Sequence, residues 1–281
     1  MNIGVIGVGV VGGALVEAFR EKNFKVSFYD KKVPGSSLTN VLGTDIIFIC
    51  LPTPTFAKTG KQDLGSLEML LSKLSLANYA GVVCIKSTVL PGTCTKLCTC
   101  LPNLRITHNP EFLTAAQPLL DFRSQKVTYV SGALGDTNVL ERLYAAYDAQ
   151  LEVCVYEDHA YTEMIKYVHN CFLATKVGFF NDMFDICAAL KLNYDSMLEG
   201  ALRLKSIGAG HTRVPGPDGK RGFGGMCFIK DTGALYAWAE QELNINCNVI
   251  GACIASNEIR RPEAYNGEET TGLFLREGVR V

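Results

Sequence analysis

One cysteine in this chain follows a run of glycines, in the segment GFGGMCFIKD at residues 222–231. A thiol becomes a nucleophile when neighbouring donors or cations stabilise its thiolate, and glycines leave backbone N–H groups open and leave room for a substrate. If a helix begins here, Cys227 lies near its positive end and Asp231 lies one turn further on. The chain has 11 cysteines, most of which we expect to be small buried hydrophobes. Cys227 is therefore either one more buried thiol or a catalytic nucleophile.

Three further polar residues stand where a ligand can be bound. Glu111, in THNPEFL, follows a predicted strand, and ligands of α/β proteins bind beyond the carboxyl ends of strands. Lys166 and Asn170 are four residues apart in a predicted helix, so they share one face and can hold one polar ligand. Taken singly, each of the three is equally compatible with a helix cap or a surface residue.

A glycine triplet near the N-terminus predicts a dinucleotide site. Gly7, Gly9 and Gly12 in VIGVGVVGGAL lie between a predicted strand and a predicted helix. The first allows a tight turn, the second lets the backbone approach a pyrophosphate, and the third lets helix and strand pack closely. The next strand ends at Asp30, the position of the acid that accepts ribose hydroxyls, which favours NAD over NADP. Lys31 directly after it weakens that preference.

The first half of the sequence predicts the sheet that positions these residues. Short apolar runs alternate with helical stretches up to about residue 155, and several runs lack the polar alternation of half-exposed strands. The predicted strands are Ile3–Ile6, Val26–Tyr29, Ile46–Leu51, Val82–Ile85, Arg105–Thr107, Val127–Val130 and Val153–Tyr156. The pattern indicates an α/β fold with a doubly wound, Rossmann-type sheet.

The second half predicts helices. A stretch of about thirty residues from Ala160, interrupted only by Gly178, indicates one long helix linking two domains. Further helices are expected over residues 193–206 and 232–243, with a Gly/Pro-rich loop between them that is too long to be a mere connector. We expect an NAD-binding domain at 1–157, a connecting helix at 158–190, and a mainly helical domain with the cysteine loop at 191–281.

Composition excludes several classes of function. The net charge of -1 gives no electrostatic footprint for nucleic acid or an anionic membrane. No apolar run reaches the roughly 18 residues that span a bilayer, and the N-terminus lacks a basic signal-peptide region. We therefore expect a cytoplasmic protein with reduced thiols. Cys94, Cys98 and Cys100 have no second ligand pair nearby, so no metal is expected, and the histidines at 108, 159 and 169 are expected in the core or on the surface.

Taken in order, these stretches resemble the UDP-glucose/GDP-mannose dehydrogenase family, whose members use NAD to oxidise the C6 alcohol of a sugar nucleotide twice, to a carboxylate. The matching segments are GVIGVGVVG, DIIFICLPTPT, KSTVLPGT, NPEFLTAA, EMIKYVHNCFLATKVGFFND and VPGPDGKRGFGGMCFIKDTGAL. They span about residues 2 to 260 in the family's order. Six collinear motifs are far more specific than the glycine triplet alone.

The resemblance implies a role for each matched residue. Cys227 corresponds to the catalytic thiol and Asp231 to the acid that helps activate water or the thiol. Lys166 and Asn170 correspond to the groups that stabilise an oxyanion at C6, with Glu111 and Thr88 handling protons and positioning water. The residues expected to face NAD are Gly7, Val8, Gly9, Val10, Val11, Gly12, Asp30, Lys31, Pro52, Thr53 and Thr88. Those expected at the substrate are Glu111, Phe112, Leu113, Lys166, Asn170, His211, Arg213, Gly222, Phe223, Gly224 and Gly225.

The implied reaction converts UDP-glucose to UDP-glucuronate through an aldehyde, which the Cys227 thiolate captures as a thiohemiacetal and then holds as a thioester until water releases the acid. Covalent capture explains why a dehydrogenase would need a cysteine, because a free aldehyde could escape between the two oxidations. The family also implies a homodimer formed through the long helix, with residues 191–281 as the substrate and dimerisation domain.

Three departures from the family pattern stand out. Ala115 replaces a second glutamate on the cofactor side, and Ile229 stands where proline is common. A third α/β domain that grips the nucleotide is also missing from the residues after about 260. We expect the loop between the helices to hold the nucleotide instead, through the basic residues Lys205, His211, Arg213, Lys220 and Arg221.

Rival functions stay open at this stage. The same chemistry on GDP-mannose or a UDP-N-acetylhexosamine fits the motifs equally well. A single-step 3-hydroxyacid dehydrogenase has a related fold and a helix lysine but needs no cysteine. A non-catalytic protein that binds NAD or a sugar nucleotide is a third class, which the retention of Cys227 and its polar partners disfavours.

Overall fold

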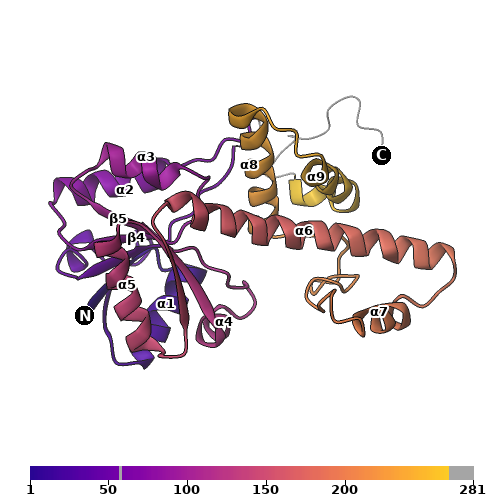
Figure 1. The fold of residues 1–281 in the computed structure, drawn as a ribbon, viewed down its shortest axis with the longest axis horizontal. Coiled ribbons are helices and arrows are strands. Elements are labelled where there is room, and N and C mark those ends of the chain that lie inside the picture. Colours follow the sequence, from indigo (N-terminus) through magenta and orange to yellow (C-terminus); the bar gives the residue numbers. More distant parts are fainter. Residues whose placement is uncertain (57–58, 266–281) are drawn as a thin grey trace. The chain divides into compact units, whose positions relative to one another are not determined.

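The computed structural model describes residues 1–56 and 59–265 of the chain (Figure 1). They form two compact units. The first comprises Met1–Thr53 and Asp63–Lys166, and the second comprises Pro54–Gln62 together with the chain from Tyr167 onward. The boundary falls within one long helix, between Lys166 and Tyr167.

A seven-stranded sheet forms the centre of the first unit, in the order β2-β1-β3-β4-β5-β6-β7. The strands are β1 Asn2–Ile6, β2 Lys25–Tyr29, β3 Ile46–Ile49, β4 Val82–Ile85, β5 Arg105–His108, β6 Val127–Ser131 and β7 Glu152–Tyr156. All neighbours are parallel except β5 and β6, which pair antiparallel through His108 and Ser131. The predicted α/β sheet and its seven strands are confirmed, although β3 ends at Ile49 rather than at Leu51.

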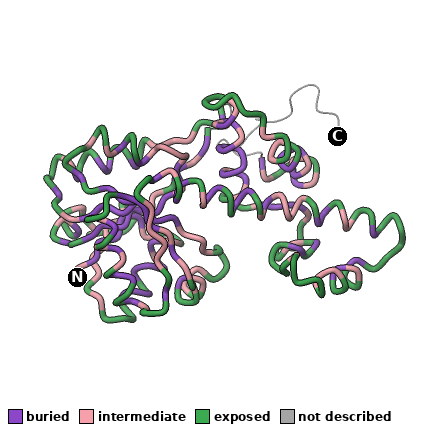
Figure 2. Tube along the Cα trace, in the orientation of Figure 1, coloured by how far each residue is buried: buried purple, intermediate pink, exposed green. Residues whose placement is uncertain are grey.

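Helices cover both faces of this sheet because the central strands are apolar on both faces. Every residue of β3 (IIFI) and β4 (VVCI) is buried (Figure 2), as expected for strands covered on both sides. One core contains buried residues of α1 Val10–Glu21, α4 Pro118–Ser124 and α5 Leu134–Tyr147. The other contains those of α2 Gly65–Leu76 and α3 Thr93–Cys100. The unit is therefore doubly wound, as the sequence predicts.

The second unit is helical. The predicted long helix is confirmed as α6 His159–Ala189, which continues without a break through Gly178. It is followed by α7 Tyr194–Leu202, α8 Met226–Leu243 and α9 Asn248–Arg260. One small core joins α6, α8 and α9 around Ala174, Ile229 and Ile254. Another joins α6 to α7 around Phe180 and Leu198.

The helix bounds differ from the sequence prediction in three places. α7 ends at Leu202, short of the predicted residue 206, and Lys205 has a positive φ of 45° that a helix cannot contain. α8 begins at Met226, six residues before the stretch predicted at 232. α9 was not predicted. Its apolar residues do not form one stripe, since Val249 and Ile259 are exposed.

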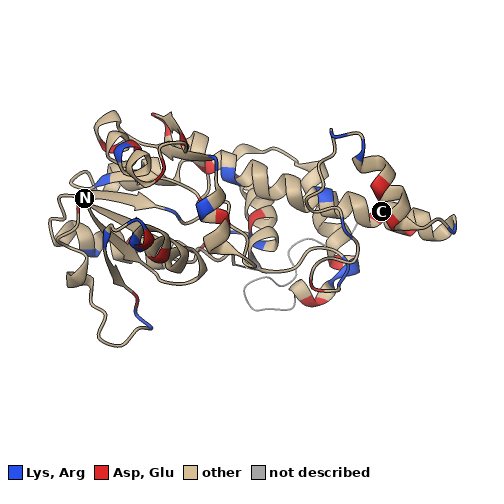
Figure 3. Ribbon diagram, turned by 90° about the horizontal axis from the view of Figure 1, so that it is seen from below, with Lys and Arg blue, Asp and Glu red and all other residues tan. Residues whose placement is uncertain are grey.

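Charge and hydropathy in the described residues agree with the composition. Lys and Arg residues are interspersed with Asp and Glu residues along the chain of both units (Figure 3). None of the described helices combines the length and the apolar character needed to cross a membrane.

Candidate active site

The glycine turn after β1 has the shape that a dinucleotide requires. Gly7 has a φ of +87°, and a Cβ there would lie 2.7 Å from the Cys50 carbonyl oxygen. A Cβ on Gly12 would lie 1.9 Å from the Gly7 carbonyl oxygen, so α1 can approach β1 only through a glycine. A Cβ on Gly9 would meet nothing within 4 Å, which leaves the outer side of the turn open to a phosphate at the N-terminus of α1. These residues fit the pyrophosphate of NAD.

Asp30 lies beside this turn. Its Oδ2 accepts a hydrogen bond from the Val8 backbone N–H at 2.7 Å, and its Oδ1 accepts one from the Lys32 N–H at 2.8 Å. These two bonds, that from Lys32 first, hold the pKa of the Asp30 carboxyl below its usual value, so the group stays ionised. A carboxylate at this position can accept ribose hydroxyls and repels a 2′-phosphate. Lys31, which the sequence also predicts to face NAD, is exposed.

The residues after β3 and β4 lie together at the same edge of the sheet. The Thr53 hydroxyl donates to the Thr88 carbonyl oxygen at 2.6 Å, and the Ser87 hydroxyl donates to the Leu51 carbonyl oxygen at 2.7 Å. β1 lies between β2 and β3, which is the point where the strand order reverses and where α/β sheets bind ligands. The structure thus brings Thr53 and Thr88 to the edge that carries the glycine turn.

Glu111 and Lys166, singled out separately in the sequence, form an ion pair in the first unit. The Lys166 Nζ donates to the Glu111 carbonyl oxygen at 2.5 Å and lies 3.2 Å from its Oε1. The Leu113 N–H donates to the other carboxylate oxygen at 2.6 Å. The Nζ also lies 5.2 Å from the centroid of the Phe112 ring. Lys166 is only 4% exposed, so its ammonium is held in a fixed place by these partners.

A buried lysine that the sequence analysis missed supports this pair. The Lys86 Nζ donates to the Asn109 carbonyl oxygen at 2.9 Å and to its Oδ1 at 2.8 Å. The Asn109 Nδ2 donates to the Thr128 hydroxyl at 2.9 Å, and the Tyr144 hydroxyl donates to the Asn109 Oδ1. Burial lowers the pKa of Lys86. The network fixes Asn109 two residues before Glu111; its signal in the sequence is a lysine at the end of the apolar run VVCIK.

A second missed residue fixes the start of α6. Glu163 is fully buried, and its carboxylate accepts from the Gly92 N–H at 2.6 Å and the Cys94 N–H at 2.7 Å. These are N–H groups at the N-terminus of α3, where a helix favours negative charge. Burial raises the pKa of Glu163. Because Glu163 lies about one turn before Lys166, it ties that turn of α6 to α3.

In the second unit, Cys227 is the second residue of α8 and is exposed. Gly225, the N-cap, has a φ of 76° and no side chain to compete for the N–H groups of the first turn. Those groups and the helix dipole favour a thiolate. Cys84 and Cys171, two of the five buried cysteines, show the opposite environment. Burial raises the pKa of each thiol, that of Cys84 to about 12. The structure thus distinguishes Cys227 from the buried thiols.

Asn170 and Asp231 meet in this unit. The Asn170 Nδ2 donates to the Asp231 Oδ2 at 2.6 Å, and the Lys230 ammonium is paired with the other carboxylate oxygen. Asp231 is 1% exposed and Asn170 is 3% exposed. His169 contacts the Asn170 Oδ1 through its Nδ1 at 2.9 Å. Asn170 of α6 and Asp231 of α8, which the sequence singled out separately, are thus joined directly, and the amide of Asn170 is held in one orientation.

The long loop between α7 and α8 contains two of the residues predicted to contact the substrate, His211 and Arg213. His211 has a φ of 62°, and its ring lies 5.6 Å from the ring of Phe228. Partial burial, with smaller effects of His169 and Lys176, lowers the pKa of His211. Arg213 is exposed. Lys176 on α6 donates to the carbonyl oxygens of residues 207 and 208 at 2.8 and 2.7 Å.

The candidate residues therefore divide between the two units. The first unit holds the glycine turn, Asp30, Lys31, Pro52, Thr53, Thr88, Glu111, Phe112, Leu113 and Lys166, and the second holds Asn170, His211, Arg213, residues 222–225, Cys227 and Asp231. Within the described ranges, no three His, Cys, Asp or Glu side chains lie close enough to hold a metal ion.

Comparisons with known proteins place this arrangement in context. The NAD binding domain of the UDP-glucose/GDP-mannose dehydrogenase family matches residues 35–148, and the central domain of the same family matches residues 160–259. The chain is 33% identical to the UDP-glucose 6-dehydrogenase of Rickettsia prowazekii over 77% of its own length and 50% of that protein. It is 28% identical to the GDP-mannose 6-dehydrogenase of Pseudomonas aeruginosa over 80% of its own length and 53% of that protein. The chain thus spans about half the length of these curated relatives.

Solved structures agree with the fold. A UDP-glucose dehydrogenase from the archaeon Pyrobaculum islandicum superposes with a TM-score of 0.79 at 26% identity, over 92% of this chain and 68% of that one. A 3-hydroxyisobutyrate dehydrogenase from Mycobacterium tuberculosis reaches a TM-score of 0.71 at 14% identity, over 96% of both chains. The second likeness extends to the fold alone.

Proposed function

Because the chain belongs to the UDP-glucose/GDP-mannose dehydrogenase family, we propose that it oxidises the C6 alcohol of a sugar nucleotide to the carboxylate, with UDP-glucose as substrate and UDP-glucuronate as product. The observation that carries the proposal is the placement of Cys227 in the first turn of α8, in the unit where Asp231 is hydrogen-bonded to Asn170. A dehydrogenase that oxidises only an alcohol to a carbonyl has no need of such a thiol.

The first unit would hold NAD. The open face of Gly9 and the N-terminus of α1 suit the pyrophosphate, and the ionised Asp30 suits the ribose hydroxyls. Pro52, Thr53 and Thr88 follow β3 and β4 at the same edge of the sheet. Bound NAD would supply the hydride acceptor, with one NAD molecule for each of the two oxidations at C6.

Cys227 acts between the two oxidations. Its thiolate adds to the C6 aldehyde, which forms a C–S bond and leaves an oxyanion on O6. The Lys166 ammonium and the Asn170 amide stabilise this oxyanion. Loss of the second hydride from C6 restores the C=O bond and leaves a thioester. Water then adds to the thioester, the C–S bond breaks, and the thiolate of Cys227 is released with the carboxylic acid.

The carboxylates handle the protons. Glu111, held by Lys166 and the Leu113 N–H, accepts a proton from the attacking water or positions it together with Thr88. Asp231, buried and held by Asn170, helps activate the thiol or the water. Phe112, Leu113, His211, Arg213, Gly224 and Gly225 would contact the sugar nucleotide, whereas the predicted Gly222 and Phe223 are buried and bonded to Asn181 and Asn257.

We also propose that the protein is a homodimer formed through α6. One stripe of this helix exposes large apolar side chains, namely Tyr161, Met164, Val168, Phe172, Phe179 and Ile186, which are 38–64% exposed. They recur at intervals of three, four or seven residues, so they lie on one face. A second copy of the helix would remove this stripe from water.

The cysteine chemistry is tested by the yield of NADH per sugar. The wild-type chain should form two NADH per UDP-glucose, whereas Cys227→Ser should lose the complete oxidation because a hydroxyl is a far weaker nucleophile than a thiolate. Cys100→Ser, at another exposed thiol, is the matched control and should behave as wild type. The measurement is NADH absorbance combined with product analysis by mass spectrometry.

Substrate choice is decided in the same assay. Turnover of GDP-mannose or a UDP-N-acetylhexosamine in preference to UDP-glucose would move the proposal to that substrate. An unchanged yield of NADH in Cys227→Ser would contradict the covalent mechanism. NAD binding without turnover of any of these sugar nucleotides would instead indicate a binding protein.

A further inference from the structure

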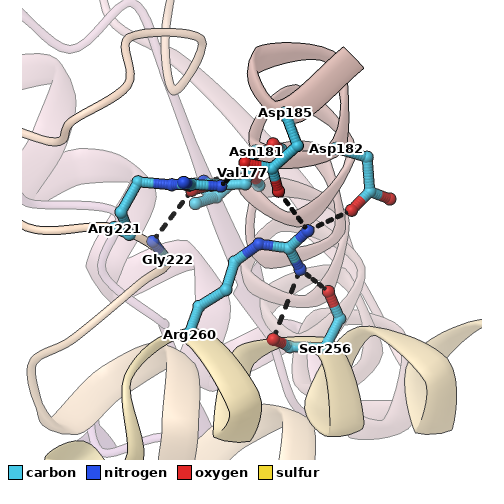
Figure 4. Close-up of polar contacts among 8 residues, drawn as sticks. All are labelled: Val177, Asn181, Asp182, Asp185, Arg221, Gly222, Ser256 and Arg260. Atoms are coloured by element: carbon cyan, nitrogen blue, oxygen red, sulfur yellow. Dashed lines mark hydrogen bonds and ion pairs between the residues drawn. The ribbon is translucent and has the colours of Figure 1, made fainter. Parts of the chain in front are cut away.

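The segment that leads into α8 is held by a buried asparagine of α6. Asn181 is 1% exposed, and its Oδ1 accepts from the Arg221 Nε at 2.8 Å and from the Gly222 N–H at 3.2 Å (Figure 4). Its carbonyl oxygen accepts from the Arg221 Nη2 at 3.2 Å. Its Nδ2 donates to the Val177 carbonyl oxygen at 2.9 Å, which fixes the amide on α6.

A second buried asparagine holds the next residue. Asn257 on α9 is 2% exposed, and its Oδ1 accepts from the Phe223 N–H at 2.7 Å while its Nδ2 donates to the Phe223 carbonyl oxygen at 2.9 Å. The same Nδ2 also donates to the Tyr265 hydroxyl at 3.0 Å. One side-chain amide therefore satisfies both backbone groups of Phe223, which fixes the position and the direction of the chain there.

The glycines of this segment fit these partners closely. Gly222 has a φ of +68°, and a Cβ there would lie 2.3 Å from the Asn257 Oδ1. A Cβ on Gly224 would lie 2.4 Å from the Arg261 Cζ, and the Arg261 guanidinium is itself paired with Asp218. Only Gly225 has nothing within 4 Å of a Cβ. The space beside Gly222 and Gly224 is thus occupied by the side chains of Asn257 and Arg261, and is not left open for a substrate.

We propose that Asn181 and Asn257 are positioning residues for Cys227, an inference that rests on the function proposed above. Phe223 lies four residues before Cys227, with the turn at Gly225 between them. The two asparagines fix the chain just before that turn, so they determine where α8 begins and where its first N–H groups point. A thiolate on Cys227 is stabilised only if those groups surround it.

Other contacts in the second unit hold α6, α8 and α9 together, so the two asparagines are not needed merely to stabilise the helix packing. α6, α8 and α9 already share an apolar core that includes Ala174, Ile229 and Ile254. The Arg260 guanidinium adds ion pairs with Asp182 and Asp185 of α6 (Figure 4). The helices are therefore packed together without the two asparagine amides, whose remaining effect is on the segment before Cys227.

The test is the reactivity of Cys227 toward iodoacetamide as a function of pH, followed on the tryptic peptide GFGGMCFIK of residues 222–230, which contains a single cysteine. Asn257→Asp keeps the acceptor for the Phe223 N–H but places a carboxylate oxygen against the Phe223 carbonyl. The midpoint of alkylation should rise by about one pH unit because the thiolate loses ordered donors. The kcat should fall by about 100-fold, as for a misplaced catalytic group, while KM for NAD stays within about twofold of wild type.

Two further variants keep the result interpretable. Asn181→Ala should raise the alkylation midpoint in the same direction, and it provides the test if Asn257→Asp does not fold. Tyr265→Phe removes only the outer hydrogen bond of Asn257 and should match wild type in both readouts. An alkylation profile equal to wild type in the folded Asn181 and Asn257 variants would overturn the proposal.

Alkylation of Cys227 does not require turnover of a substrate. The positioning role of Asn181 and Asn257 can therefore be tested independently of the proposed oxidation. A wild-type chain that oxidises no sugar nucleotide would refute the proposed function. A higher alkylation midpoint in the asparagine variants would still show that they position the Cys227 thiol.

Discussion

At the scale of single residues, the chain contains polar groups whose protonation in the folded state differs from that in the unfolded state. His108 is fully buried at the end of β5, with its Nδ1 2.7 Å from the Thr162 hydroxyl oxygen. Burial lowers the pKa of His108 from 6.5 to about 3. Between these values the unfolded chain binds a proton that the folded chain does not, so the contribution of His108 to stability is complete above pH 6.5 and is lost progressively as the pH falls toward 3.

We therefore expect the free energy of unfolding to fall on acidification, with His108 contributing at most about 1.4 kcal/mol per pH unit. His108→Gln cannot take up a proton and should show a shallower fall below pH 6.5. Urea denaturation of both proteins at a series of pH values measures the difference, and the curves should run parallel above pH 7. If the free energy of unfolding fell equally steeply with pH in the two proteins below pH 6, His108 would not be the source of the effect. Glu163 and Lys86 are present in both proteins and contribute equally to each.

The candidate catalytic residues could be singled out from the sequence, whereas the residues that hold them in place could not. Cys227 and Glu111 could be singled out because residue type, flanking glycines or a preceding strand mark them in the sequence. Lys86 was missed although it ends the apolar run VVCIK. Asn109, Glu163, Asn181 and Asn257 were missed because nothing in the local sequence distinguishes a buried polar residue from a surface one. The long-range partners of these residues are 19 to 71 residues away in the chain, so only the tertiary structure reveals them.

At the scale of elements, Glu163 links α6 to the N-terminus of α3. Glu163→Gln keeps one acceptor oxygen but places an NH2 group against the N–H of Gly92 or Cys94. We expect the free energy of unfolding to fall by about 1–3 kcal/mol because a buried donor loses its partner. Chemical denaturation at pH 7 measures the loss.

Glu68→Gln is the matched control for Glu163→Gln. Glu68 lies in the first turn of a helix, α2, but it is exposed, so its substitution should change the free energy of unfolding by less than about 0.5 kcal/mol. Equal effects of the two substitutions would refute a structural role for the buried carboxylate.

The strands of the sheet were predicted from the sequence, whereas α9 was not, and the difference has a physical reason. The strands of the sheet are short apolar runs that a parallel sheet buries on both faces, so their pattern alone identifies them. α9 buries Cys253, Ile254 and Asn257 but exposes Val249 and Ile259. Its burial is decided by packing against α8 and the segment before Cys227, which the periodicity of the sequence does not reveal.

At the scale of the whole molecule, the exposed stripe of α6 predicts the oligomeric state. Phe172 is 64% exposed near the middle of the stripe, so Phe172→Glu should place a charge in the interface and yield a monomer. Light scattering after size-exclusion chromatography should give about twice the chain mass for wild type and the chain mass for the variant.

Leu190→Glu provides the control for this experiment. Leu190 is 63% exposed but follows the end of α6, so this variant should keep the mass of the wild type. A monomeric wild type, or a dimer that Phe172→Glu leaves intact, would contradict dimerisation through the stripe.

The antiparallel junction in the sheet has a consequence for local unfolding. β5 and β6 pair through one residue on each strand, His108 and Ser131, whereas β6 and β7 pair through five. The Thr162 hydroxyl adds a side-chain bridge, because it contacts both His108 and Ser131. We therefore expect the β5–β6 junction to open before the β6–β7 pair does. Amide hydrogen exchange at this junction would then report the protonation of His108 directly.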